Sequence, residues 1–144
     1  MNQGRLLHSY TVGKKMMEIG RSFNLSEDEI NDLFVLGLNH DIGYELNEDT
    51  SIHGEVGAEV LKRNNYKYYQ EVYYHGRITD KYSSMFLDIL NMADMQVDKD
   101  GNDVGYESRL KDIESRYGID SIVYKRCVEL INYLKERENY YKNK

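Results

Sequence analysis

The sequence contains no proline and no tryptophan, and it has a single cysteine, Cys127. Because proline interrupts helices more strongly than any other residue, its absence leaves every helical stretch unbroken. One cysteine cannot form an intramolecular disulfide, and Cys127 falls in an apolar helical pattern, so we expect a buried and inert thiol. The fold therefore depends on a hydrophobic core, which a chain of 144 residues is long enough to build.

Long apolar runs and an excess of positive charge are also lacking. No stretch approaches the length of a membrane span, and the first residues carry no apolar signal segment. Twenty-five acidic residues against nineteen basic ones give a formal charge of −6, which argues against broad attraction to a nucleic-acid backbone. We therefore expect a cytoplasmic protein that has neither a membrane nor a nucleic-acid polymer as its partner. Any phosphate group would have to be held locally, by metal ions and a few basic side chains.

Apolar residues recur at a spacing of three to four along most of the chain, which is typical of amphipathic helices. Ser26 and Glu29 form a capping box at the start of one of them. Segment 66–75 is ambiguous between helix and strand by periodicity, although a helix fits its neighbours better. The predicted helices are 3–23, 27–40, 54–63, 66–75, 81–96, 106–117 and 121–137.

This pattern predicts an all-α fold, a single-domain bundle of about six or seven helices that spans residues 1–144. The residues that carry chemistry fall within 5–95, and two C-terminal helices fall within 104–138. The charged tail, 138–144, is expected to fray.

The stretch Leu-Gly-Leu-Asn-His-Asp-Ile-Gly, residues 36–43, is an apolar helical run that ends in a histidine beside an aspartate. Buried polar groups need partners, and a metal ion is one partner for an imidazole and a carboxylate together, with Zn, Fe, Mn or Co as suitable ions. A lone His-Asp pair at a helix end is usually a cap with a hydrogen-bonded histidine. The rest of the chain changes this balance, because all four histidines lie near element ends and Asp94 falls in the apolar register of 81–96. The candidate ligands of one or two divalent ions are His8, His40, Asp41, His53, His75 and Asp94.

The order of these residues resembles the HD-domain superfamily of metal-dependent phosphohydrolases, and the resemblance runs from Arg5 to Asp94. The pieces that carry it are Arg-Leu-Leu-His-Ser (5–9), Leu-Asn-His-Asp-Ile-Gly (38–43), His-Gly-Glu-Val-Gly-Ala (53–58), Tyr-His-Gly (74–76) and Met-Ala-Asp (92–94). The chain looks most like the small, single-domain bacterial members, which include hydrolases of symmetrical dinucleoside tetraphosphates. The resemblance implies that His8, His40, Asp41 and Asp94 hold one metal ion. In binuclear members Asp41 would bridge to a second ion held by His53 and His75.

The expected function is that of a divalent-metal-dependent phosphohydrolase acting on a small phosphate ester or anhydride, with a nucleotide or dinucleoside polyphosphate as the expected substrate. Two cations that share a carboxylate can lower the pKa of a bound water and neutralise charge on a phosphoryl oxygen. The resemblance thus implies that Asp41, His53 and His75 are the candidate catalytic residues, and that the cofactor is one or two ions of Fe, Mn, Co, Zn, Ni or Mg. The candidate phosphate contacts are Arg5, Arg77 and Lys81, which lie near His8 and His75 in the sequence and for which surface solvation is the competing explanation.

The sequence departs from the common pattern of the superfamily at one point. Many HD proteins place a lysine directly after the His-Asp-Ile-Gly run, whereas Tyr44 and Glu45 follow it here. Two alternatives to an enzyme stay open: a non-catalytic, metal-bound module that serves interaction or sensing, and a plain bundle whose histidines are placed by chance. Within catalysis, HD proteins also include oxygenases and cyclic-dinucleotide phosphodiesterases, and the longer motif of the latter is not seen. A homodimer is left open.

Overall fold

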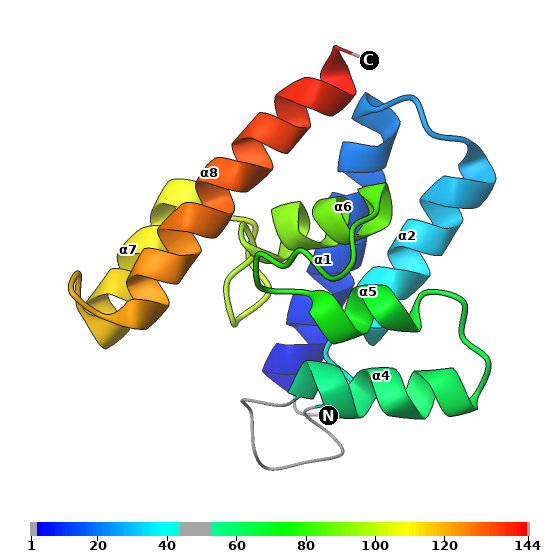
Figure 1. Cartoon of the computed structure of the whole chain (residues 1–144), viewed down its shortest axis with the longest axis horizontal. Coiled ribbons are helices and arrows are strands. Elements are labelled where there is room, and N and C mark those ends of the chain that lie inside the picture. The colour runs from blue at the N-terminus through cyan, green and yellow to red at the C-terminus, as the bar shows by residue number, and fades with distance from the viewer. Residues whose placement is uncertain (1–2, 44–52, 144) are drawn as a thin grey trace.

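The computed structural model describes residues 3–43 and 53–143, and within these ranges the chain forms seven helices and no strand (Figure 1). This confirms the predicted all-α class. None of the described helices is long and apolar enough to cross a membrane. The helices are α1 (Gln3–Ser22), α2 (Glu27–Asn39), α4 (His53–Arg63), α5 (Tyr69–Tyr74), α6 (Met85–Asp94), α7 (Gly105–Tyr117) and α8 (Ile122–Lys142).

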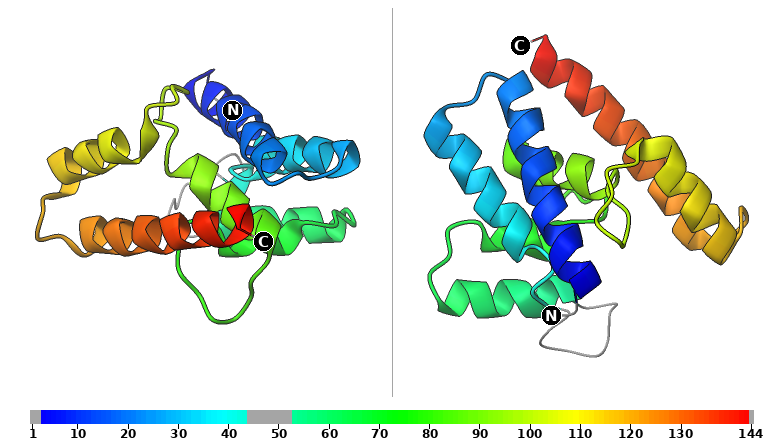
Figure 2. Two further views of the ribbon diagram at one scale, coloured as in Figure 1. Left: turned by 90° about the horizontal axis from the view of Figure 1, so that it is seen from above. Right: turned by 180° about the vertical axis from the view of Figure 1, so that it is seen from behind.

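Helices α1 and α2 lie side by side and antiparallel, as both views of Figure 2 show. The predicted capping box starts α2: the Ser26 hydroxyl accepts the Glu29 backbone N–H, and the Glu29 carboxylate accepts the Ser26 N–H. The two helices cross where glycine faces glycine, because a Cβ atom on Gly37 would collide with the backbone of Gly13. This close approach brings residues near the start of α1 next to residues at the end of α2.

Helix α6 runs through the middle of the molecule and packs against α1, α2, α5 and α8. Eight of its residues are buried, from Phe86 to Ala93. The helix begins at Met85 and not at Lys81 as predicted, because the Ser84 hydroxyl caps it by accepting the Leu87 N–H at 2.9 Å. The preference for a helix over a strand in segment 66–75 is confirmed, but the helix is shorter than predicted and covers only Tyr69–Tyr74.

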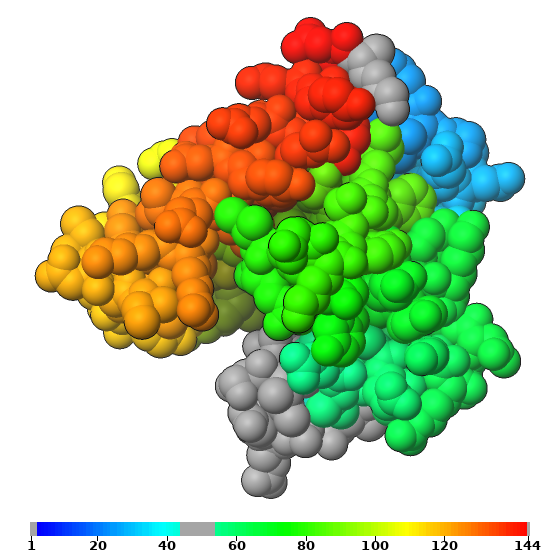
Figure 3. Space-filling view, in the orientation of Figure 1, coloured from blue at the N-terminus to red at the C-terminus, as the bar shows by residue number. Residues whose placement is uncertain are grey.

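Helices α7 and α8 form a hairpin whose connecting turn projects from the rest of the molecule, while the C-terminal half of α8 packs against α6 (Figure 3). The prediction that the tail frays after Arg137 is wrong, because α8 continues to Lys142. Tyr141 is buried, and its hydroxyl donates to the Asp88 carboxylate at 2.5 Å. Arg137 donates to the same carboxylate at 3.2 Å, so the end of α8 is fastened to α6. Cys127, expected to be buried, is only partly so.

Candidate metal centre

The candidate ligands come from the ends of helices. His40 and Asp41 directly follow α2, His75 directly follows α5, and Asp94 is the last residue of α6, while His8 lies in the second turn of α1. The C-terminal end of a helix carries a partial negative charge from its unpaired carbonyl groups. Three such ends meeting at one place therefore favour a positive charge between them.

Five of the predicted side chains converge. Asp94 Oδ1 lies 2.9 Å from His8 Nε2 and 3.4 Å from His40 Nε2. Asp41 Oδ2 lies 3.4 Å from His8 Nε2 and 3.2 Å from His40 Nε2, and Asp41 Oδ1 lies 3.6 Å from His75 Nε2. In two overlapping groups of three, His8 with His40 and Asp41, and His40 with His75 and Asp94, all ligand atoms lie within 4.8 Å of one another. The structure therefore brings together three imidazoles and two carboxylates from four helices.

Each of the three imidazoles is oriented by a backbone carbonyl. Since a carbonyl oxygen can only accept, Nδ1 of each ring carries the hydrogen and donates it. The acceptors are Asp98 O for His8 at 2.9 Å, Gly37 O for His40 at 2.6 Å and Val72 O for His75 at 2.5 Å. Two of these carbonyls belong to the last turns of α2 and α5, where helices have unpaired acceptors. In its neutral form each ring therefore turns the lone pair of Nε2 towards the carboxylates.

This arrangement fits a cation and leaves a buried atom unsatisfied without one. The His40 side chain is 0% exposed, and its Nε2 has no hydrogen-bond partner of acceptable geometry among the described residues. A lone pair that faces carboxylate oxygens, which are themselves acceptors, needs either a proton or a metal ion between the two. Three nitrogen and two carboxylate donors suit divalent ions of the Zn, Fe, Mn and Co type. The residues present therefore fit the cofactor that the sequence predicts.

The charged groups at the centre shift the pKa values of Asp94, His40 and His8 in favour of their charged forms. Burial by itself would raise the pKa of Asp94, but the neighbouring imidazoles of His40 and His8 hold that pKa well below its usual value. Burial would likewise lower the pKa of His40, but Asp41 and Asp94 raise it well above its usual value. The pKa of His8 is also raised, against the effect of burial, by its hydrogen bond to Asp94. The Asp94 carboxylate thus stays ionised, and it favours a positive charge at the ring nitrogens of His8 and His40.

The remaining predicted site residues are not brought to these carboxylates by any described contact. His53 begins α4, but its side chain lies outside the described residues. Arg77 is exposed, stacks over the rings of Tyr73 and Tyr74, and lies 3.9 Å from Glu55. Lys81 is exposed and Arg5 is half-buried in the first turns of α1. Their roles as phosphate contacts stay predictions.

A family model described as HD domain matches residues 5–135 of this chain. The chain belongs to the HD-domain family. Neither the curated proteins nor the solved structures with which the chain was compared gave a match. HD domains are all-α and are generally metal-dependent hydrolases, so the predicted fold class and family are confirmed, and the cluster of His8, His40 and Asp41 is compatible with the metal that such domains bind.

The sequence did not predict the groups that position the candidate ligands of the HD domain without being ligands themselves. The loop after α6 holds the His8 ring through the Asp98 carbonyl, and Gly101 of the same loop packs directly on Leu7. The Asn91 side chain, buried in α6, accepts the Gly76 N–H at 2.7 Å and so fixes the chain next to His75. Asn91 could have been found, because it breaks the apolar register of α6 as Asp94 does. The Asp98 contact could not, because a backbone carbonyl leaves no signal in the sequence.

Proposed function

We propose that this HD domain is a divalent-metal-dependent phosphohydrolase that acts on a small phosphate ester or anhydride. The observation that carries the proposal is the convergence of three imidazoles with two carboxylates, each imidazole held by a backbone carbonyl so that Nε2 is directed inward. The buried Nε2 of His40 faces carboxylate oxygens of Asp41 and Asp94, at 3.2 and 3.4 Å, and a divalent ion between these atoms would satisfy all three groups at once.

In this proposal the ligands of the metal are His8, His40, Asp41, Asp94 and His75. The two oxygens of Asp41 face different partners, Oδ2 towards His8 and His40 and Oδ1 towards His75. A carboxylate whose two oxygens face different partners could contact two ions. We propose His53 as a further ligand of the second ion. The ion is one of the divalent metals Fe, Mn, Co, Zn, Ni or Mg.

The metal, when bound, supplies Lewis-acid activation of a phosphoryl oxygen and of the attacking water. The chain's own residues provide its setting. The Nδ1–H···O=C hydrogen bonds keep each ring in the tautomer that binds metal, and the burial of His40 keeps bulk water from its Nε2. Asp41 and Asp94 supply the negative charge that holds a dication. Asp41, His53 and His75 are the residues that we expect to act nearest the reacting phosphate.

For the substrate we propose a nucleotide or a dinucleoside polyphosphate. A net charge of −6 disfavours a nucleic-acid polymer, so the phosphates of a small molecule would be held at the metal and by a few cations. Arg77 is the cation that we place first in this role, because it lies two residues after His75 and is exposed. Arg5 and Lys81 are the other two.

The experiment that tests this function combines metal analysis with an assay. The purified chain is analysed for bound metal, and phosphate release from a panel of mono- and dinucleotides is measured with Mn, Co, Fe or Mg added. We expect metal-dependent release that Asp41→Asn abolishes and that Asp120→Asn, an exposed control, leaves unchanged. Metal that is bound without turnover of any substrate in the panel would favour the second candidate, a non-catalytic metal-bound module that serves interaction or sensing.

A further inference from the structure

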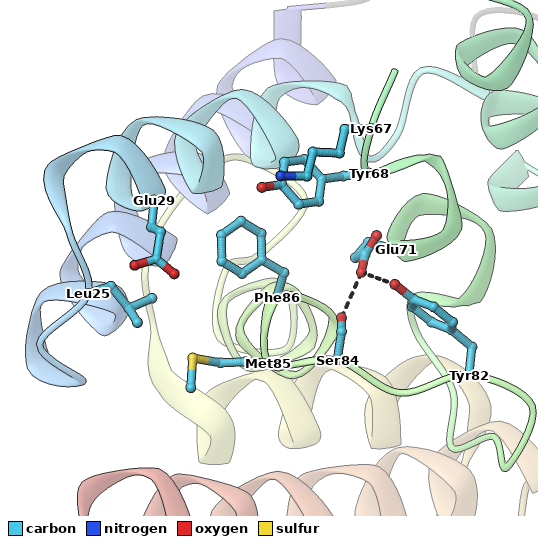
Figure 4. A pocket seen from close by; sticks show the side chains of 9 residues that line it. All are labelled: Leu25, Glu29, Lys67, Tyr68, Glu71, Tyr82, Ser84, Met85 and Phe86. Carbon is cyan, nitrogen blue, oxygen red and sulfur yellow. Dashed lines mark hydrogen bonds between the residues drawn. The ribbon is translucent and has the colours of Figure 1, made fainter. Parts of the chain in front are cut away.

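A second hollow lies away from the candidate metal centre, between the start of α2, α5 and the start of α6 (Figure 4). Its volume is about 430 Å³, and no residue proposed as a metal ligand lines it. The cavity is large enough for a small organic molecule.

The Glu71 carboxylate lies at the inner side of the cavity and has no cationic partner. Glu71 is only 3% exposed, and its Oε2 accepts hydrogen bonds from the Tyr82 hydroxyl at 2.6 Å and the Ser84 hydroxyl at 2.7 Å. Both donors are neutral, and burial together with Glu71 raises the pKa of Tyr82 to about 12, so the phenol keeps its proton. Among the described residues, no Lys, Arg or His nitrogen forms an ion pair with Glu71, and no group donates to its Oε1. The first turn of α5 and the two hydroxyl groups stabilise this buried carboxylate in part, but no cationic group among the described residues pairs with it.

The walls of the cavity are aromatic and acidic. The Tyr68 and Phe86 rings are stacked with their centroids 4.8 Å apart. The Lys67 ammonium lies 5.2 Å from the centroid of the Tyr68 ring, so this ring already accepts a cation on its face. Glu29 adds a second carboxylate at the rim, and Figure 4 shows it on the opposite side of the cavity from Glu71. Two carboxylates against one ammonium leave the lining negative and unsuited to an anion.

We propose that this cavity binds a small organic cation, a primary ammonium or guanidinium group on an aliphatic chain. The charged group pairs with the Glu71 carboxylate, and the aliphatic chain lies against the apolar and aromatic wall that includes Phe86. Such a ligand supplies the counter-charge that Glu71 lacks and buries apolar surface at the same time. The proposal does not depend on the function proposed for the metal centre.

The test is a calorimetric titration of the full chain with cadaverine, and with pentanediol as the neutral analogue of the same shape. We expect saturable binding of cadaverine that weakens as salt is raised, and none of the diol. N-acetyl-lysine methylamide, in a parallel arm, shows whether the site takes a free diamine or a lysine side chain of a polypeptide. Glu71→Gln, which keeps the shape and the acceptor for the two hydroxyls, should weaken binding by about tenfold or more.

Two controls locate the binding. Glu59→Gln removes an exposed carboxylate from α4 and should leave the affinity unchanged. Glu29→Gln preserves the capping box, because glutamine also serves at that position, and should weaken binding only a few-fold. Treatment with a chelator should not alter the affinity for cadaverine, since the metal centre is not involved. Equal binding of the diol, insensitivity to salt in the wild-type chain, an undiminished affinity of Glu71→Gln, or loss of binding with the chelator would overturn the proposal.

Discussion

At the scale of single residues, the Asp94 carboxylate lies within 3.4 Å of two imidazole nitrogens, those of His8 and His40. The Asp94 side chain is only 17% exposed, so solvent screens its interaction with the two imidazoles weakly. Asp94→Asn keeps the volume and removes the charge, and we expect metal affinity to fall by more than about tenfold. The measurement is metal content after dialysis against a weak chelator. Asp120→Asn should keep its metal, and equal retention by the two variants would contradict the assignment of Asp94 as a ligand.

The raised pKa values of His8 and His40 predict opposite effects of pH on the metal-free and metal-bound chains. Without metal, the protonated rings stabilise the fold fully below their usual pKa of 6.5, and this stabilisation is lost as the pH rises through the raised folded-state values. A divalent ion requires neutral rings, so the stabilisation by added metal should grow over the same interval. Melting temperatures measured against pH with and without Mn would therefore diverge as the pH rises. Parallel curves would show that the rings do not bind the ion.

At the scale of elements, the crossing of α1 and α2 sets the separation of His8 from His40. A Cβ atom at Gly37 would collide with Gly13, so Gly37→Ala must push the helices apart. We expect a loss of about 2 kcal/mol in the free energy of unfolding, after allowing for alanine's better helix propensity, together with weaker metal binding. Urea denaturation measures the first effect. Asn31→Ala, at an exposed position of α2, should change stability by less than about 0.5 kcal/mol.

The end of α8 provides a second prediction at this scale. Tyr141 donates a hydrogen bond to the buried Asp88 carboxylate, which also pairs with Arg137. Tyr141→Phe removes one donor from a buried acceptor, and we expect a loss of about 1–2 kcal/mol in the free energy of unfolding. Tyr117→Phe, on an exposed ring, should be neutral in the same thermal or urea unfolding measurement. If both variants were equally stable, the tail would not be anchored as the structure has it.

The sequence predicted most elements of the fold but placed some of their ends wrongly. The capping box of Ser26 and Glu29 is a local signal and was read correctly. The tail after Arg137 was expected to fray because its residues are mostly charged or polar, whereas its anchor, Asp88, lies 53 positions from Tyr141. Periodicity reports on one helix at a time, so a partner that distant leaves no trace in it. The late start of α6 combines a local cap by Ser84 with a distant contact, because Tyr82 and Ser84 both donate to Glu71 and so stay outside the helix.

At the scale of the whole molecule, most of the candidate site was predictable because its members are ionisable residues within otherwise apolar helical patterns. Asp94 stands in an apolar register, and His40 ends an apolar helix. What could not be predicted is how the rings are aimed, since the carbonyls that hold them are backbone atoms of the α2, α5 and post-α6 segments. The second cavity escaped sequence reasoning for a related reason. Glu71 lies in a short, aromatic helix where one acidic residue is unremarkable, and only the folded chain shows that it is buried.

Anomalous diffraction from crystals of the chain grown with Mn tests most directly whether side chains from α1, α6 and the end of α2, far apart in the sequence, bind a divalent ion together. We predict a strong anomalous peak among His8 Nε2, His40 Nε2 and the carboxylates of Asp41 and Asp94. The same crystals of Asp41→Asn should show a much weaker peak there or none. An undiminished peak in that variant, or Mn found only at other positions in the wild-type chain, would contradict the account.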